Sequence, residues 1–168
     1  MKSLRTKSIS IVFFIMMLPV ICGCAPEKTV TDITDSGIVI YNTDDSTDPL
    51  NYITYVNKEI NAIMNTLSSH IGNGENLIHG RYVLNDEIEN VKTSLNSINE
   101  AIEFVEGLNP PDGYSDDRES ILRCMANAEE TLKEYQQVLE LHETTGIPDC
   151  IDLMQGDYTA LSGVFSLA

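Results

Sequence analysis

Four stretches of the chain carry apolar residues at alternating steps of three and four positions. Such steps place the apolar side chains on one face of a helix, and an average step of about 3.5 residues keeps one contact seam along it. The stripes are Ile53, Val56, Ile60, Ile63 and Leu67; Leu84, Ile88, Val91, Leu95, Ile98, Ile102 and Val105; Ile121, Met125, Ala128, Leu132, Tyr135 and Leu139; and Ile151, Met154, Tyr158, Leu161 and Phe165. The sequence therefore predicts an all-α antiparallel bundle of three or four helices.

Capping residues predict where the first helix begins and ends. Asp48 is a good N-cap, and Pro49 follows it at the first helical position, where proline is tolerated. Gly72 and Gly74 come after the last apolar residue of the stripe, and glycine disfavours the helical interior. We therefore expect the first helix to run from Asp48 to about Gly72.

The remaining boundaries follow from prolines and acidic residues. The second helix begins between residues 77 and 86 and must end before Pro110, because a residue that precedes proline disfavours the helical conformation. Asp116 and Glu119 resemble a capping box at the start of the third helix. Gly146 and Pro148 are predicted to end the third helix, and Asp149 to cap the fourth. Gly156 and Gly163, which lie in the fourth helix, are predicted to let it approach a neighbouring helix closely.

The first residues have the layout of a secretion signal. Lys2, Arg5 and Lys7 precede an apolar run from Ile9 to Ile21 that contains no charged residue. The run is about 13 residues long, whereas a helix needs about 20 to cross a bilayer. The pattern therefore predicts a segment that directs export, rather than a membrane-spanning helix.

The residues at the end of this run, Ile21, Cys22, Gly23 and Cys24, resemble the lipobox of bacterial lipoproteins. Ile21 and Gly23 match its two specificity positions, and Cys24 matches its cysteine, while Cys22 departs from the small or hydroxyl residue usual there. The resemblance implies that type II signal peptidase removes residues 1–23 and that Cys24 carries a diacylglyceryl anchor. It places the mature chain on the extracytoplasmic face of a bacterial membrane.

The chain is therefore divided into residues 1–23 as signal peptide, 24–47 as lipid-anchored acidic tether and 48–168 as helical bundle domain. The tether is rich in Thr, Asp and Ser and has no helical period. The segment from Ile38 to Tyr41 departs from this polar composition. It is predicted to form a short strand, to pack on the domain or to serve as a hydrophobic docking segment. These alternatives stay open at the level of sequence.

The charge of the chain argues against nucleic acid as a partner. The formal net charge is −16, and no stripe of basic residues stands against it. Affinity for phosphate backbones depends on clustered Lys and Arg side chains. Cleavage after Gly23 removes three positive charges and no negative one, which makes the mature chain more acidic still, at −19.

Cys124 and Cys150 remain once Cys24 is lipidated, and an even pair outside the cytoplasm invites a disulfide. Geometry opposes the bridge. Cys124 lies near the start of the third predicted helix and Cys150 just beyond its end, a separation of roughly 30 Å along the axis. We therefore expect two free thiols, with Cys124 as a small buried apolar residue.

No motif predicts a catalytic, cofactor or metal site. The three histidines, His70, His79 and His142, are expected at the surface, and they lack the Glu-x-x-His and His-Glu-x-x-His spacings of metal sites. Asn42, Asp44, Asp45 and Asp48 lack the glycine and closing glutamate of a calcium loop. No Gly-x-Ser-x-Gly elbow is present, so we expect the chain not to be an enzyme.

The segment from Leu108 to Tyr114 carries Pro110 and Pro111 and is the most distinctive loop. It is similar to the proline corner between long helices in small helical lipoproteins of Gram-positive bacteria. It predicts a stiff helix-to-helix turn, with an exposed recognition loop as the alternative.

These observations together predict a membrane-anchored extracytoplasmic lipoprotein whose bundle is a binding or interaction module for an envelope protein or a glycan. The alternative is an extracytoplasmic enzyme or metal carrier whose site one sequence does not reveal. The anchor on Cys24 is the membrane contact in either case.

Replacement of Cys24 by Ala tests the anchor. Because the thioether forms on the cysteine sulfur, we expect the variant to lose the diacylglyceryl mass and to leave the membrane fraction. Intact-mass spectrometry and membrane fractionation check this, with Cys22→Ala as the matched control that keeps the anchor. Processing and membrane retention of Cys24→Ala at the wild-type level would contradict the prediction.

Overall fold

The computed structural model describes residues 46–165. Four helices account for most of them: α1 (Pro49–Ile78), α2 (Leu84–Gly107), α3 (Ser115–Glu140) and α4 (Ile147–Phe165), with a short 3₁₀ helix, η2 (Thr144–Gly146), before α4. The described range contains no β-strand, so the predicted all-α bundle is confirmed. The predicted signal peptide, the lipidation site Cys24, the tether up to residue 45 and the segment Ile38 to Tyr41 lie outside the described residues.

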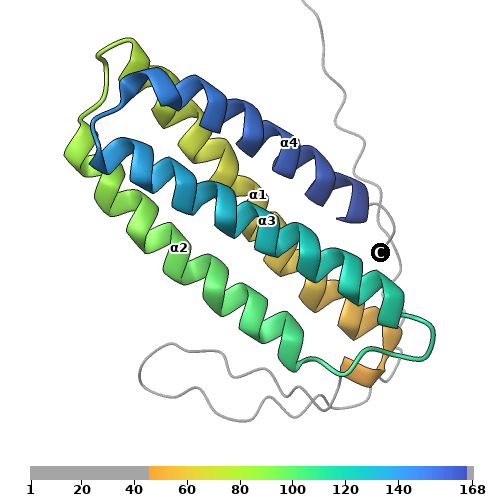
Figure 1. Cartoon of the computed structure of the whole chain (residues 1–168). Coiled ribbons are helices and arrows are strands. Elements are labelled where there is room, and N and C mark those ends of the chain that lie inside the picture. Colours follow the sequence, from red (N-terminus) through yellow and green to blue (C-terminus); the bar gives the residue numbers. More distant parts are fainter. Residues whose placement is uncertain (1–45, 166–168) are drawn as a thin grey trace, which may run out of the picture. The chain divides into compact units, whose positions relative to one another are not determined.

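The helices lie side by side with alternating directions (Figure 1). Each packs mainly against its neighbours in the order α1, α2, α3, α4, and α4 returns to pack against α1. Short connections leave consecutive helices no other arrangement than antiparallel. Among the four neighbouring pairs, α1 and α2 contact each other least, which leaves that side of the bundle the most open.

One apolar core runs along the bundle and is built from the predicted stripes. The first and third stripes are buried almost throughout. The second is buried in its other positions but only half-buried at Leu84, Ile88 and Ile102, and the fourth is interrupted by Tyr158, which is exposed. Each fully buried Leu, Ile or Val side chain contributes about 1.5–3 kcal/mol to the stability of the fold, relative to the same side chain exposed to water. Burial of the stripes is therefore what holds the helices together. The most deeply buried large side chains are Tyr52, Ile60, Ile63, Leu67, Ile98, Leu108, Met125, Leu132, Tyr135, Leu139, Ile147 and Met154.

Two predicted boundaries are confirmed. The Asp48 side chain accepts hydrogen bonds from the backbone N–H groups of Leu50 and Asn51, both at 3.0 Å, which caps α1 as expected. Helix α2 begins at Leu84 and ends at Gly107, inside the predicted limits. Capping satisfies backbone donors that have no partner within the helix.

The predicted end of the first helix is wrong, because α1 continues through Gly72 and Gly74 to Ile78. Gly74 is buried, and a Cβ placed on it would lie 3.1 Å from Ile151 Cδ1 and 3.1 Å from the Tyr135 hydroxyl. Its missing side chain therefore lets α3 and α4 approach α1 closely. The actual stop is Gly80, whose φ of +65° suits glycine, and Arg81 N–H donates to the carbonyl of Asn76 at 2.8 Å.

The predicted capping box at Asp116 is also wrong. The N-cap of α3 is Tyr114, two residues before the predicted one, and Tyr114 gives no side-chain cap. Asp116 stands in the first turn instead, where its negative charge interacts favourably with the helix dipole. The turn before it fixes this start, because Gly113 takes a φ of +91° and Tyr114 N–H donates to the Pro111 carbonyl at 3.1 Å.

The end of α3 and the start of α4 differ from the prediction as well. Helix α3 ends at Glu140, because His142 takes a positive φ of 58° and breaks the helix before Gly146. Helix α4 begins at Ile147, so Asp149 lies in its first turn rather than at its cap. Gly156 and Gly163 face open space, with no atom within 4 Å of an added Cβ, and mark no close approach.

The two cysteines in the described part of the chain, Cys124 and Cys150, are free, as predicted. Cys150 is buried, while Cys124 is half-buried rather than fully enclosed. Burial raises the pKa of both thiols, so at neutral pH they stay protonated.

No helix among residues 46–165 combines the length and the apolar character that crossing a bilayer requires.

The two glycines of α1 give a matched test of this packing. Gly72→Ala adds a methyl group to open space and removes the helix cost of glycine, so we expect it to raise the free energy of unfolding by about 0.5–1 kcal/mol. Gly74→Ala drives the same methyl group against Tyr135 and Ile151, and we expect a loss of about 1–3 kcal/mol. Urea unfolding followed by circular dichroism measures both, and equal stabilisation by the two variants would contradict the close approach.

Candidate functional site

Polar residues occupy seam positions where α1 faces α2. The steps that bury Ile63 and Leu67 on α1 continue to His70, which is only 2% exposed. On α2, Glu87 and Ser94 stand one heptad apart, and the Glu87 side chain has no exposed surface. The expectation that His70 lies at the surface is therefore wrong, because the helical period carries it into the bundle.

The three side chains form one chain of hydrogen bonds. His70 Nδ1 lies 2.7 Å from Glu87 Oε1, and His70 Nε2 lies 2.8 Å from Ser94 Oγ. The Ser94 hydroxyl donates to Nε2 when that nitrogen carries no proton, and the neutral ring then holds its proton on Nδ1 and donates it to Glu87. The order hydroxyl, imidazole, carboxylate follows from these two contacts.

The carboxylate of Glu87 is held from a second side. The Asn73 side-chain amide donates to Glu87 Oε2 at 2.7 Å, one turn beyond His70 on α1. Tyr135 of α3 lies behind the pair, with its ring centroid 6.2 Å from that of His70. Burial and the negative charge of Glu87 raise the pKa of the Tyr135 hydroxyl, which therefore remains a neutral phenol at physiological pH.

A polar pocket opens above this network between α1 and α2, on the side where the two helices contact each other least. Its volume is about 450 Å³, within the range of small-molecule sites. Every lining residue is polar, and His70 and Ser94 are among them. The lining residues are Asn65, Thr66, Ser69, His70, Asn73, Asn90, Thr93 and Ser94.

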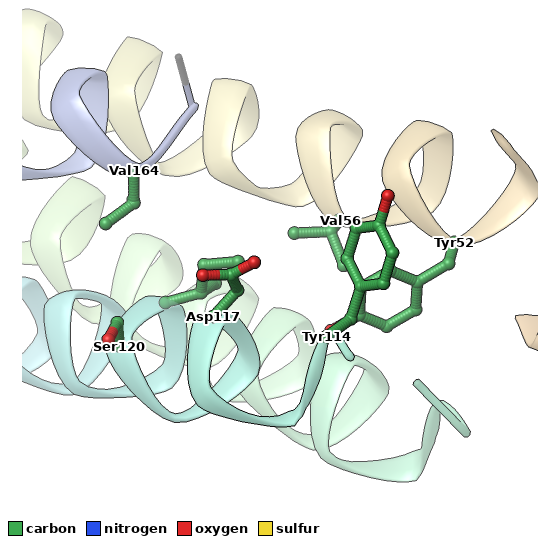
Figure 2. A pocket seen from close by; sticks show the side chains of 7 residues that line it. Tyr52, Val56, Tyr114, Asp117, Ser120 and Val164 are labelled. Atoms are coloured by element: carbon green, nitrogen blue, oxygen red, sulfur yellow. The ribbon is translucent and has the colours of Figure 1, made fainter. Parts of the chain in front are cut away.

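A second cavity lies where α1 and α3 begin and α4 ends (Figure 2). It is mostly apolar and measures about 50 Å³, which leaves room for only a few water molecules or one small group. The rings of Tyr52 and Tyr114 meet edge to face beside it, 5.8 Å apart. The remaining lining residues are Val56, Asp117, Ser120, Ile121 and Val164.

The cavity includes a buried hydroxyl. Tyr52 is 1% exposed, and its hydroxyl oxygen has no hydrogen-bond partner within the described residues. Burial raises the pKa of this hydroxyl. The small volume makes the cavity a weaker candidate for a ligand than the polar pocket.

The loop between α2 and α3 is a packed turn. Leu108 and Pro111 are buried, and Tyr114 rests half-buried against Tyr52. The Ser46 hydroxyl both donates to the Asn109 carbonyl and accepts from the Asn109 N–H, at 3.2 and 2.9 Å. The structure therefore favours the stiff turn over an exposed recognition loop.

The other sequence-based candidates do not converge. His79 is exposed at the end of α1, and His142 lies beyond α3, so neither reaches His70. Within residues 46–165 no group of three His, Cys, Asp or Glu side chains is placed to hold a metal ion. Asp48 caps α1, whereas Asn42, Asp44 and Asp45 lie outside the described residues.

Sequence motifs missed Glu87, Ser94 and Asn73. One signal could have indicated them. Glu87 and Ser94 fall at the heptad position that Ala101 and Leu108 occupy further along the same seam, where apolar residues are expected. A polar side chain buried at such a position needs a hydrogen-bond partner. His70, which continues the apolar seam of α1, is the residue that could supply it.

No protein-family model, no curated protein and no solved structure matches this chain.

The buried pair gives a test by double mutation. His70→Leu leaves Glu87 buried without its partner, and we expect it to lower the free energy of unfolding by about 3–5 kcal/mol. Combining it with Glu87→Leu removes both polar groups, so we expect stability within about 1 kcal/mol of wild type, or above it. Urea unfolding measures both variants.

Lys133→Ala serves as the control, because it removes an ion pair at the surface of α3 between Lys133 and the half-buried Glu129, and should cost less than about 1 kcal/mol. A double variant as unstable as His70→Leu alone would show instead that the bundle needs the polar pair in order to fold.

Proposed function

We propose that the mature chain is a lipid-anchored extracytoplasmic binding module that takes hydroxyl-rich, uncharged ligands such as glycans in the polar pocket between α1 and α2. The observation that carries the binding proposal is a pocket of about 450 Å³ lined only by polar side chains. The lipobox at Cys24 supports the location.

The lining chemistry supports this class of ligand. Asn65, Asn73 and Asn90 bring carboxamides, which both donate and accept hydrogen bonds, and Ser and Thr hydroxyls stand between them. Sugar hydroxyl groups likewise both donate and accept. Among residues 46–165, His70 is the only titratable side chain that lines the pocket, and the net charge of −16 disfavours polyanions.

The placement of the pocket suits a ligand outside the membrane. It opens on the side of the bundle, in the second half of α1 and the first half of α2, so access requires no separation of the helices. A lipid on Cys24 and an acidic tether up to residue 47 would hold this face in the envelope, where wall or capsule glycans and other envelope components are found.

Titration of the processed, lipidated protein in detergent with soluble envelope glycan fragments tests the proposal. Asn65→Ala and Asn90→Ala each remove a lining carboxamide, and we expect the dissociation constant to rise by roughly 5- to 100-fold, as for the loss of one polar contact. Asn96→Ala is the matched control, because Asn96 is exposed on α2 and does not line the pocket.

Isothermal titration calorimetry gives the constants. Saturable binding that is weakened by the two pocket variants and unchanged in Asn96→Ala supports the proposal. Binding of equal strength in all four proteins, or none to any fragment, counts against it.

A further inference from the structure

The contacts of His70 place each of its ring nitrogens in a distinct chemical role. Nε2 lies 2.8 Å from a hydroxyl, within the distance at which a base can activate a nucleophile. Nδ1 lies 2.7 Å from a carboxylate, within the distance at which a third group can orient the base. A carboxylate on Nδ1 fixes the tautomer that leaves Nε2 free to accept a proton, and it stabilises the imidazolium that forms.

Burial changes stepwise along this chain of groups. Glu87 has no exposed surface, His70 is 2% exposed, and Ser94 is half-buried and lines the pocket. The hydroxyl is therefore the group that an incoming molecule reaches, while the base and its carboxylate are shielded from water. Asn73 holds Glu87 from its other oxygen and fixes the orientation of the carboxylate.

Helix packing alone does not call for these residues. Removing a carboxylate and an imidazole from water costs free energy that their attraction offsets only when the geometry is good, and apolar side chains of similar volume pack at least as well. The seam positions around the pair, Val91 and Leu67 among them, hold apolar residues. A hydrogen-bonded trio with an accessible hydroxyl is instead the arrangement that nucleophilic catalysis requires.

Donors for a developing oxyanion are available in the pocket. Ser94 lies in the interior of α2, where backbone N–H groups are used within the helix, so the donors must be side chains. Asn90 stands one turn before Ser94 on the same face. Its carboxamide already donates one N–H to the Tyr82 hydroxyl at 2.8 Å, so only its second N–H can serve an oxyanion, and Asn65 lines the α1 wall. A side-chain carboxamide can stabilise an oxyanion in the way a backbone amide does.

We propose that Ser94 is a nucleophile activated by His70, with Glu87 as its positioning residue, and that the pocket hydrolyses short acyl esters of hydroxyl-rich alcohols. The inference rests on the pocket of the proposed function and adds a reaction to it. The ester class follows from the residues that line the pocket. They are all polar and offer hydrogen bonds to a polar alcohol, and none of them is a large apolar side chain that would contact a long acyl chain.

The reaction balances with water as the only co-reactant. Ser94 Oγ forms a bond to the ester carbonyl carbon, the π pair moves onto the carbonyl oxygen, and the hydroxyl proton passes to His70 Nε2. The bond from that carbon to the alcohol oxygen then breaks, and Nε2 returns the proton to the departing oxygen. Water attacks the acyl group on Ser94 by the same route and releases the carboxylic acid and free Ser94.

Active-site labelling tests the nucleophile directly. The processed full-length protein in detergent is treated with a fluorophosphonate, which phosphonylates activated serines, and the adduct is mapped by peptide mass spectrometry. We expect one adduct, on Ser94, and none in Ser94→Ala. Ser97→Ala is the matched control, since Ser97 lies on α2 outside the pocket and its hydroxyl donates to the Thr93 carbonyl.

Hydrolysis of 4-nitrophenyl acetate gives the rate. We expect Ser94→Ala to lower kcat/KM by at least about 100-fold, and Ser97→Ala to match wild type. Glu87→Gln should lower kcat and leave KM unchanged, as expected for a residue that acts through His70. Ser94→Ala changes one half-buried hydroxyl, and circular dichroism establishes that the variant is folded.

The two proposals fail separately. A folded wild-type protein that gives no Ser94 adduct and no hydrolysis above Ser94→Ala overturns the nucleophile, even if glycan binding depends on Asn65 and Asn90. Labelling of Ser94 with loss of hydrolysis in Ser94→Ala supports it, even if no glycan fragment binds.

Discussion

Every feature of this bundle depends on apolar side chains that recur at steps of three and four along each helix. No helix of this kind is stable alone in water, because its apolar face stays exposed until other helices cover it. Four such faces close on one another through short antiparallel connections, and the shared core fixes the rotation of each helix about its axis. The rotation in turn decides which side chains meet inside the bundle.

The same constraint places the candidate site. Once Leu67 and Val91 are fixed in the core, the helical period leaves His70 and Glu87 no position but the interior. Each polar group must then find a partner there, and the trio with Ser94 satisfies that requirement where α1 and α2 are least tightly packed. Openness on this side and polarity at the seam together produce a polar pocket beside a hydroxyl, an imidazole and a carboxylate that are joined by hydrogen bonds.

The helix ends show how far sequence reasoning reaches. Asp48 was predictable because its cap involves only neighbouring residues. Gly74 was misjudged as a stop because its role depends on Tyr135 and Ile151, which are far away in the sequence. The start of α3 was misplaced for a related reason, since Gly113 and the Pro111 carbonyl set the turn before any side-chain cap acts. Local signals predicted local contacts, and packing decided the rest.

By itself, the sequence determined the helical class, the number of seams and most of the core, because apolar periodicity is a property of each segment taken alone. It also carries a segment that resembles a lipobox, a pattern of consecutive residues around Cys24. Only the tertiary structure decided that His70, Glu87 and Ser94 meet, because their contact joins two helices whose relative rotation and register no single segment contains.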